Sequence, residues 1–379
     1  MIIACPKETH INENRVAIVP SSVKEYLKSG LDINIESGAG INSYFTNKDY
    51  LDNGAKIISE KRELLNKADI IVKVNPPTAE EAQLLRNEST FVSLFQTLKE
   101  KEIIDIFIQK KITAFSMHLI PRTTLAQKMD ALSSQSNIAG YMSILMGSAC
   151  LPVYMPLLMT AAGTIPPAKV LILGAGVAGL QAIATAKRLG AQVEAFDVRP
   201  DVKEQVESLG AKFVQVEQGK DEGVGEGGYA KETSEEYKHQ QQELIKDRIS
   251  KSNLVITTAL IPGKPAPILI PKDMVDSMKP GSVIMDLAAE NGGNCELTEK
   301  DKIIDYNHVT INGLSNLPTK MPLHASQLYS KNISSFLTYF LKDGELKLNL
   351  DDEIISGSMF THEGKITNQI TLDHFNNEK

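Results

Sequence analysis

The stretch Lys169-Val-Leu-Ile-Leu-Gly174-Ala-Gly176-Val-Ala-Gly179 decides the fold of this chain. It begins as a short apolar strand and runs into three glycines with the spacing G-x-G-x-x-G. A helix of small residues follows, and Gly190 is expected to end it. Gly174 permits a tight turn, Gly176 lets the backbone approach a pyrophosphate, and Gly179 lets helix and strand pack closely. The pattern predicts a βαβ unit that binds a dinucleotide at a helix N-terminus.

The next predicted strand, 192–197, ends on Asp197, 18 residues after Gly179. A carboxylate at this place accepts hydrogen bonds from the adenosine ribose and repels a 2′-phosphate, which favours NAD over NADP. Arg199 leaves NADP open, because an arginine here can pair with a 2′-phosphate. We give Asp197 precedence because it stands at the strand end itself. The alternative to a nucleotide site is a glycine turn with a structural role only.

The composition is that of a globular protein of about two domains. The 379 residues are 42% hydrophobic and 23% charged, with a net charge of −7. This negative balance argues against nucleic acid and against electrostatic attachment to a membrane. The three cysteines (Cys5, Cys150 and Cys295) are far apart, which indicates a reducing compartment and no structural metal. The apolar N-terminus is too short for a signal peptide and is predicted to be a strand.

Residues 131–168 form a run of 38 residues without a charge, long enough in principle to span a bilayer. Gly147, Pro152, Pro156 and Gly163 interrupt it, so we predict a buried helix or pair of helices that joins two domains. The region from Tyr141 to Tyr154 lacks the charges of a solvent-facing helix. A dimer partner, another subunit or lipid must therefore cover its apolar surface.

Strand-like and helix-like runs alternate over the first 120 residues, which predicts a mostly parallel sheet with helices on both faces. The fold class is therefore α/β, with two doubly wound Rossmann-like parallel-sheet domains joined by long helices. Residues 1–131 and 320–379 are predicted to form the first domain, because a second connecting helix at 323–341 returns the chain to it. Residues 132–319 form the dinucleotide-binding domain. The expected strands are 2–5, 32–36, 56–58, 69–74, 90–95, 112–117, 169–173, 192–197, 212–216, 253–259, 282–287 and 309–311.

The glycine-rich, charged segment 219–231 has too little apolar content to pack and is predicted to be a loop. By composition alone, a functional loop and an insertion without function are equally good interpretations. The loop after strand 253–259 and the turn at 290–293 follow strand ends, where ligands bind in such sheets.

Three motifs carry a resemblance to a known family. The opening 7–17 with Pro20 resembles alanine dehydrogenase and the NAD(H)-binding domain of proton-translocating transhydrogenase. Arg122-x4-Gln127-x2-Asp130-x2-Ser133-Ser-Gln-Ser-Asn resembles the Arg-Gln-Asp loop of the transhydrogenase, and 159–167 resembles its entry to the nucleotide domain. The similarity also covers 197–199, 227–232, 257–263 and 286–293, and it spans nearly the whole chain.

The resemblance implies the NAD(H)-binding domain I, a soluble alpha subunit, of a Si-specific, proton-translocating NAD(P)+ transhydrogenase. Such a subunit passes hydride between NADH and the NADP(H) on a partner subunit, and a membrane-spanning subunit moves protons. It implies a homodimer that is active only with these partners. It also implies a cytoplasmic protein attached peripherally to the inner membrane through them, without nucleic acid or metal.

The resemblance also assigns residues. Arg122, Gln127, Asp130 and Ser133 are expected to contact the nicotinamide and its ribose as the catalytic set. The segment 219–231 corresponds to the family's mobile loop over the nucleotide, which favours a functional loop. The residues expected to bind the cofactor are Thr123, Thr124, Lys128, Met129, Gly174, Gly176, Val177, Gly179, Asp197, Val198, Arg199, Gly228, Tyr229, Gln241, Ala259 and Leu260.

The alternative is a free-standing, NAD-dependent alanine dehydrogenase, which needs a general acid–base because an amine proton moves with the hydride. Phe95 stands where that relative has a catalytic histidine, and Glu290 replaces its aspartate. Arg15 and Lys73 match its carboxylate-binding pair, which keeps the alternative open, although a structural pair explains them as well. We interpret His118 as a structural histidine. A third possibility is an NAD-sensing module, which would have no use for the 122–133 motif.

Overall fold

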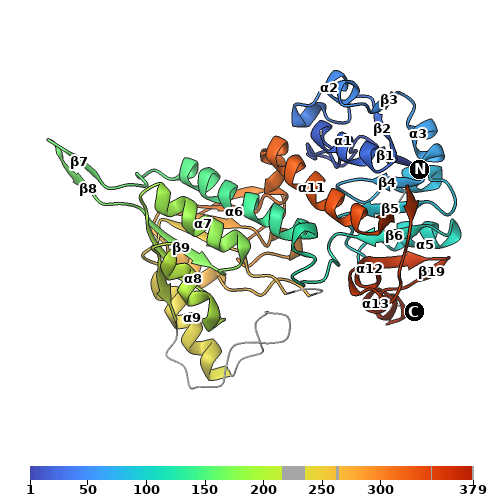
Figure 1. Ribbon diagram of the computed structural model, residues 1–379. Helices are drawn as coiled ribbons and strands as arrows, with labels where there is room; N and C mark the ends of the chain where they lie inside the picture. Colours follow the sequence, from blue (N-terminus) through green and yellow to red (C-terminus); the bar gives the residue numbers. More distant parts are fainter. Residues whose placement is uncertain (216–234, 262–263, 343, 378–379) are drawn as a thin grey trace. The chain divides into compact units, whose positions relative to one another are not determined.

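The computed structural model describes residues 1–215, 235–261, 264–342 and 344–377. The chain forms two compact units (Figure 1). The first comprises Met1–Gln135 and Thr319–Lys379, and the second comprises Ser136–Pro318.

The first unit is built on an eight-stranded sheet of order β19-β18-β6-β5-β4-β1-β2-β3. The six strands from the N-terminal region are parallel, whereas β18 and β19 run antiparallel at one edge. The strands are β1 (Ile2–Cys5), β2 (Asp32–Glu36), β3 (Lys56–Ile58), β4 (Ile70–Val72), β5 (Thr90–Ser93), β6 (Thr113–Ser116), β18 (Met359–His362) and β19 (Lys365–Ile366).

Alternate residues of these strands point to opposite faces, and each face is buried. Ile3, Ile70 and Val72 belong to a cluster with α1 and α11, whereas Ala4 and Ile71 belong to another with α3, α4 and α5. The helices of this unit are α1 (Pro20–Lys28), α2 (Asn47–Asp52), α3 (Lys61–Lys67), α4 (Ala79–Leu84), α5 (Lys101–Gln109), α11 (Pro322–Phe340), α12 (Glu353–Ser358) and α13 (Gln369–Asn377). A small ladder joins β16 (Leu341–Lys342) to β17 (Glu345–Leu346).

The second unit is a doubly wound sheet of order β11-β10-β9-β12-β13-β15-β14, parallel except for β14. The strand order reverses between β9 and β12. The strands are β9 (Lys169–Leu173), β10 (Gln192–Phe196), β11 (Lys212–Val214), β12 (Leu254–Thr257), β13 (Val283–Asp286), β14 (Ile303–Tyr306) and β15 (Val309–Asn312).

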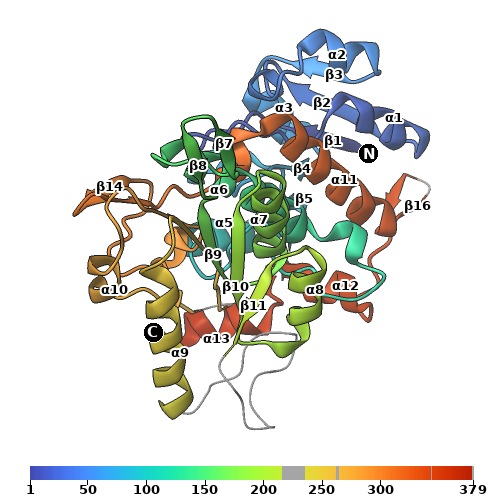
Figure 2. The ribbon, with the colours of Figure 1, turned by 90° about the vertical axis from the view of Figure 1, so that its left-hand side faces the viewer.

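The helices of the second unit cover both faces of its sheet. Val170 and Ile172 pack with α7 (Val177–Arg188) and α8 (Lys203–Ser208), which lie beside β9–β11 in Figures 1 and 2. Leu171 and Leu173 pack instead with α9 (Glu235–Ile249) and α10 (Lys272–Asp276). The predicted α/β class with doubly wound parallel sheets is confirmed.

The uncharged run 131–168 is helical only in its first half, as α6 (Ala131–Cys150). The prediction of a buried helix or helices is wrong beyond Cys150. Pro152 and Pro156 prevent the helix from continuing, and β7 (Leu158–Thr160) and β8 (Gly163–Ile165) form an antiparallel hairpin with mostly exposed side chains. No helix within the described residues is long and apolar enough to cross a bilayer.

The C-terminal tail returns to the first unit, as predicted, because β18 pairs with β6. Strands β14, β18 and β19 are not among the strands predicted from the sequence. They have only two to four residues each, too short for a clear alternation of apolar and polar side chains.

Candidate functional site

The glycine turn of the second unit has the backbone that its spacing predicts. Gly174 has a φ of 104°, which side chains disfavour, and a Cβ there would lie 2.4 Å from Thr258 Oγ1. A Cβ on Gly179 would lie 1.9 Å from the Gly174 carbonyl oxygen. Only glycine therefore allows α7 to approach the end of β9 this closely.

The N-terminus of α7 is suited to an anion. Gly176 occupies the N-cap position without a side-chain cap, so no side chain takes up the first-turn amides. A Cβ on Gly176 would meet nothing nearer than Arg199 Nη2 at 4.0 Å, which leaves open space above the turn. Val177, in the first turn, is exposed. These features fit the pyrophosphate of a dinucleotide.

Asp197 follows β10 and connects that strand end to the glycine turn. Its Oδ2 accepts from the Ala175 backbone N–H at 2.7 Å and from Arg199 Nη2 at 2.9 Å. Its Oδ1 accepts from the backbone N–H and the Nε of Arg199, at 2.9 and 3.0 Å. The guanidinium is therefore folded back on the carboxylate. Val198 lies between them, half-buried against the sheet core.

The end of β12 lies next to the same turn. Thr258 donates from Oγ1 to the Gly174 carbonyl at 3.0 Å, and Ala259 and Leu260 follow it. Leu260 is exposed. Gln241 lies half-exposed in α9, and among the described residues its side chain makes no hydrogen bond to the turn. The predicted residues Gly228 and Tyr229 lie outside the described residues.

In the first unit, the predicted catalytic residues share one loop that ends at α6. Asp130 caps this helix, since its Oδ1 accepts from the Ser133 N–H at 2.8 Å and its Oδ2 from Ser133 Oγ at 2.5 Å. Ala126 and Met129 are buried in the core and anchor the loop. The remaining predicted residues of the loop are exposed or half-exposed: Arg122, Thr123, Thr124, Gln127 and Lys128.

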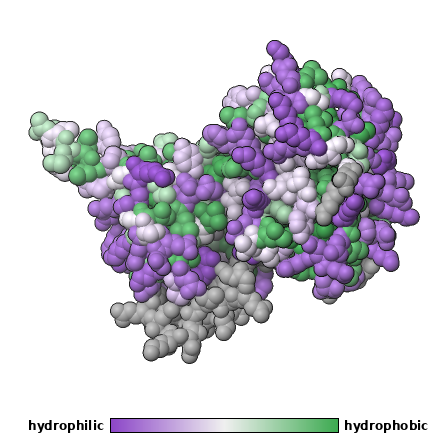
Figure 3. Space-filling view, viewed as in Figure 1, coloured by the Kyte–Doolittle hydropathy of each residue, from purple (hydrophilic) through white to green (hydrophobic). Residues whose placement is uncertain are grey.

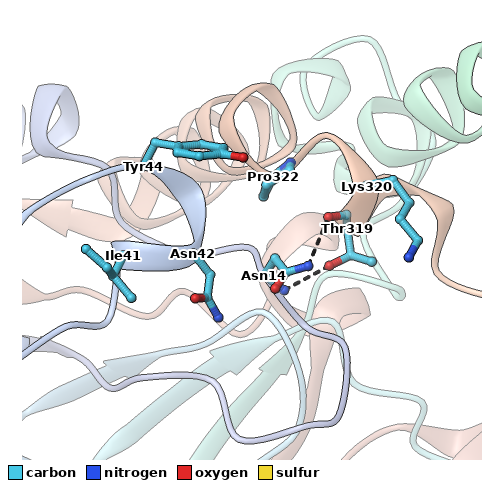
Figure 4. A pocket seen from close by; sticks show the side chains of 7 residues that line it. All are labelled: Asn14, Ile41, Asn42, Tyr44, Thr319, Lys320 and Pro322. Carbon is cyan, nitrogen blue, oxygen red and sulfur yellow. Dashed lines mark hydrogen bonds between the residues drawn. The ribbon is translucent and has the colours of Figure 1, made fainter.

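Two surface depressions occur in the first unit. One, of about 520 Å³, is lined by Gln127, Lys128 and Ser134 together with residues of α11. The other, of about 390 Å³, contains no predicted site residue (Figure 4). Asn14 donates to Thr319 Oγ1 there at 2.8 Å, below the ring of Tyr44.

The cations that match the alanine dehydrogenase pair are buried with carboxylates of this chain. Arg15 donates to Glu13 from Nε and Nη2, at 2.8 and 2.6 Å, and to Gln135 from Nη1 at 2.8 Å. Although burial opposes it, the charge of Arg15 lowers the pKa of Glu13 to about 2. The buried Lys73 Nζ lies 2.6 Å from Glu81. Both cations are thus already paired, which supports the structural interpretation.

The acid–base groups of an amino-acid dehydrogenase are not available at the expected places. Phe95 is fully buried, with its ring 4.5 Å from that of Phe360 and 6.0 Å from that of Phe107. Burial, with the charges of Lys99 and Arg15, lowers the pKa of His118 to about 4, so this histidine is neutral at pH 7. Within the described residues, no cluster of three or more His, Cys, Asp or Glu could hold a metal ion.

Sequence reasoning missed Thr258 and Asn294, which support the turn and the loop after β12. Thr258 directly follows a predicted strand end, a signal that could have identified it. Asn294 follows the Gly292-Gly293 turn, and nothing in its local sequence indicates that it reaches the loop after β12, 35 residues earlier.

Comparison with known proteins agrees with this arrangement. The alanine dehydrogenase/PNT N-terminal domain matches residues 4–139, and the C-terminal domain matches residues 143–369. The chain therefore belongs to the alanine dehydrogenase/PNT family of α/β proteins.

Within the family, the strongest similarity is to the transhydrogenase branch. The chain is 46% identical over 377 residues to an NAD(P) transhydrogenase subunit alpha of Rhodospirillum rubrum, and the match covers 97% of each chain. The crystal structure of transhydrogenase from Sinorhizobium meliloti matches with a TM-score of 0.88 and 42% identity over 97% of this chain and all of that one. An alanine dehydrogenase of Staphylococcus saprophyticus is 29% identical, over 99% of this chain and 97% of that one. The predicted resemblance to transhydrogenase alpha subunits is confirmed.

Proposed function

We propose that this chain is the NAD(H)-binding subunit of a proton-translocating NAD(P)+ transhydrogenase of the Si-specific type. It passes hydride between NADH and NADP+ held on a partner subunit. The observation that carries the proposal is the uncapped N-terminus of α7 beside Asp197, in a chain so similar to transhydrogenase alpha subunits. A membrane-spanning subunit moves the protons, and the chain is attached peripherally to the cytoplasmic face of the inner membrane.

In this proposal the amides at Gly176 and Val177 bind the pyrophosphate and Asp197 binds the adenosine ribose. Arg122, Gln127, Asp130 and Ser133 hold the nicotinamide and its ribose. Hydride transfer between two nicotinamides releases no proton at the reacting carbons, so no general base is required. The role of the chain is to orient the ring, and small errors of placement slow such a step strongly.

The test is reconstitution with the NADP(H)-binding partner, measured as hydride exchange from NADH. We expect exchange only in the mixture, and no oxidation of NADH by pyruvate and ammonia. Gln127→Asn should slow exchange at least about tenfold more than it weakens NADH binding, because misplacement of the ring affects reactivity most. Pyruvate-dependent oxidation would instead identify an alanine dehydrogenase. NADH binding without exchange in the mixture would identify an NAD-sensing module.

A further inference from the structure

The side chain of Asn294 is fully buried and makes three hydrogen bonds to a loop far away in sequence. Its Oδ1 accepts from the Ala259 backbone N–H at 3.0 Å, and its Nδ2 donates to the Ala259 carbonyl at 2.9 Å. Nδ2 also donates to the Pro267 carbonyl at 2.8 Å. The amide therefore pairs both backbone groups of Ala259 and holds the two ends of the segment 259–267 together.

Asn294 is itself held by the buried carboxylate of Asp286, at the end of β13. Asp286 Oδ2 accepts from the Asn294 N–H at 2.7 Å, the Cys295 N–H at 3.0 Å and Thr298 Oγ1 at 2.6 Å. Its Oδ1 accepts from Thr257 Oγ1 at 2.9 Å, at the end of β12. A continuous set of buried hydrogen bonds thus ties the loop after β12 to two strand ends of the sheet.

The topology indicates which half of a dinucleotide this loop faces. Ala259 follows β12 and Asp197 follows β10, and β9 lies between these two strands. A dinucleotide in such a sheet lies across the point where the strand order reverses, with one nucleotide on each side. Since Asp197 takes the adenosine ribose, Ala259 and Leu260 lie on the side of the nicotinamide nucleotide.

We propose that Asn294 is a positioning residue that fixes Ala259 and Leu260 against the nicotinamide half of the bound NAD(H). This inference rests on the proposed function. It assigns to Asn294 an effect on NADH that an adenosine nucleotide alone does not show, because AMP occupies only the half next to Asp197.

The test is the substitution Asn294→Asp, which keeps the shape and the acceptor of the side chain but removes both donations to carbonyls. Its control is Asn312→Asp, the same change at a buried asparagine that ends β15 and accepts from the Leu314 N–H at 3.0 Å. Dissociation constants for NADH and for AMP are measured on each folded protein by titration. We expect Asn294→Asp to weaken NADH binding about tenfold and AMP binding less than about twofold, and Asn312→Asp to change neither by more than that.

Equal losses for NADH and AMP, or unchanged NADH binding, would overturn the proposal. If Asn294→Asp does not fold, Asn294→Ser removes the same donations without adding a charge and should show the same split. The unmodified chain is titrated first. Its failure to bind NADH would reject the proposed function, whereas binding without the split in the variants rejects only the role of Asn294.

Discussion

At the scale of single residues, the carboxylate of Asp197 decides which nucleotide the second unit can take. It accepts four hydrogen bonds, three from Arg199 and one from Ala175. A 2′-phosphate would therefore have to draw Arg199 away from a carboxylate that repels the phosphate itself. This arrangement favours NADH, although Arg199 lies at the right place for a phosphate ligand.

Asp197→Asn tests this argument, because the amide keeps an acceptor for Ala175 but removes the charge and releases Arg199. The unmodified chain should bind NADH more tightly than NADPH. The substitution should lower this preference at least about tenfold, as expected for the loss of charge-assisted hydrogen bonds. Titration by nucleotide fluorescence measures both constants. Equal affinities in the unmodified chain would instead make Arg199 a phosphate ligand.

At the scale of elements, α6 and α7 touch through their backbones within the second unit. A Cβ on Gly140 of α6 would lie 2.0 Å from the Ala178 carbonyl oxygen of α7. A backbone atom cannot move aside as a flexible side chain can, so the helices would have to separate. This contact holds the N-terminal turn of α7, and with it the predicted pyrophosphate site, against α6.

Gly140→Ala is therefore expected to destabilise the protein by about 1–3 kcal/mol. Gly357→Ala is the matched control, since that glycine also lies in a helix, α12, and its Cβ would meet nothing nearer than 3.8 Å. Without a clash, alanine should be neutral or stabilising by up to about 1 kcal/mol. Thermal unfolding midpoints compare the two variants. A Gly140→Ala protein as stable as the control would show that the helices can separate at no cost.

At the scale of the whole molecule, the hairpin β7–β8 exposes apolar side chains that a soluble monomer rarely collects in one place. Met159 is 73% exposed, and Figure 3 shows hydrophobic residues on this hairpin. Its exposed apolar residues and those just before it are Val153, Tyr154, Leu157, Met159 and Ile165. We propose that a second copy of the chain covers them in the homodimer.

The combined substitution Leu157→Asp and Met159→Asp should convert the dimer to a monomer, because a charge in an apolar interface loses its hydration. Sedimentation equilibrium measures the mass, and circular dichroism checks that the fold is retained. Leu51→Asp is the control, at a residue with a similarly exposed side chain, 54%, on α2. A dimer that survives the double substitution would place the interface elsewhere.

Much of the backbone could be predicted from local sequence. The glycine spacing at 174–179 predicted β9, the turn and α7, because a positive φ and a close helix–strand approach each require glycine at a fixed position. The change from alternating to helical periodicity likewise located α3 and α5 within one residue. The hairpin after Cys150 was missed because its apolar side chains suggested burial, although its prolines were noted.

The arrangement around the turn was decided only by the tertiary structure. Asp197 and Arg199 are two residues apart, yet their mutual pairing depends on how the strand end meets Ala175. Asn294 reaches Ala259 only because β12 and β13 pair in a register that brings residues 35 apart together. Sequence alone determined the conformation of each segment, since local spacing sets backbone dihedrals. Only the fold determined which polar groups meet, since hydrogen bonds between distant residues depend on sheet register and packing.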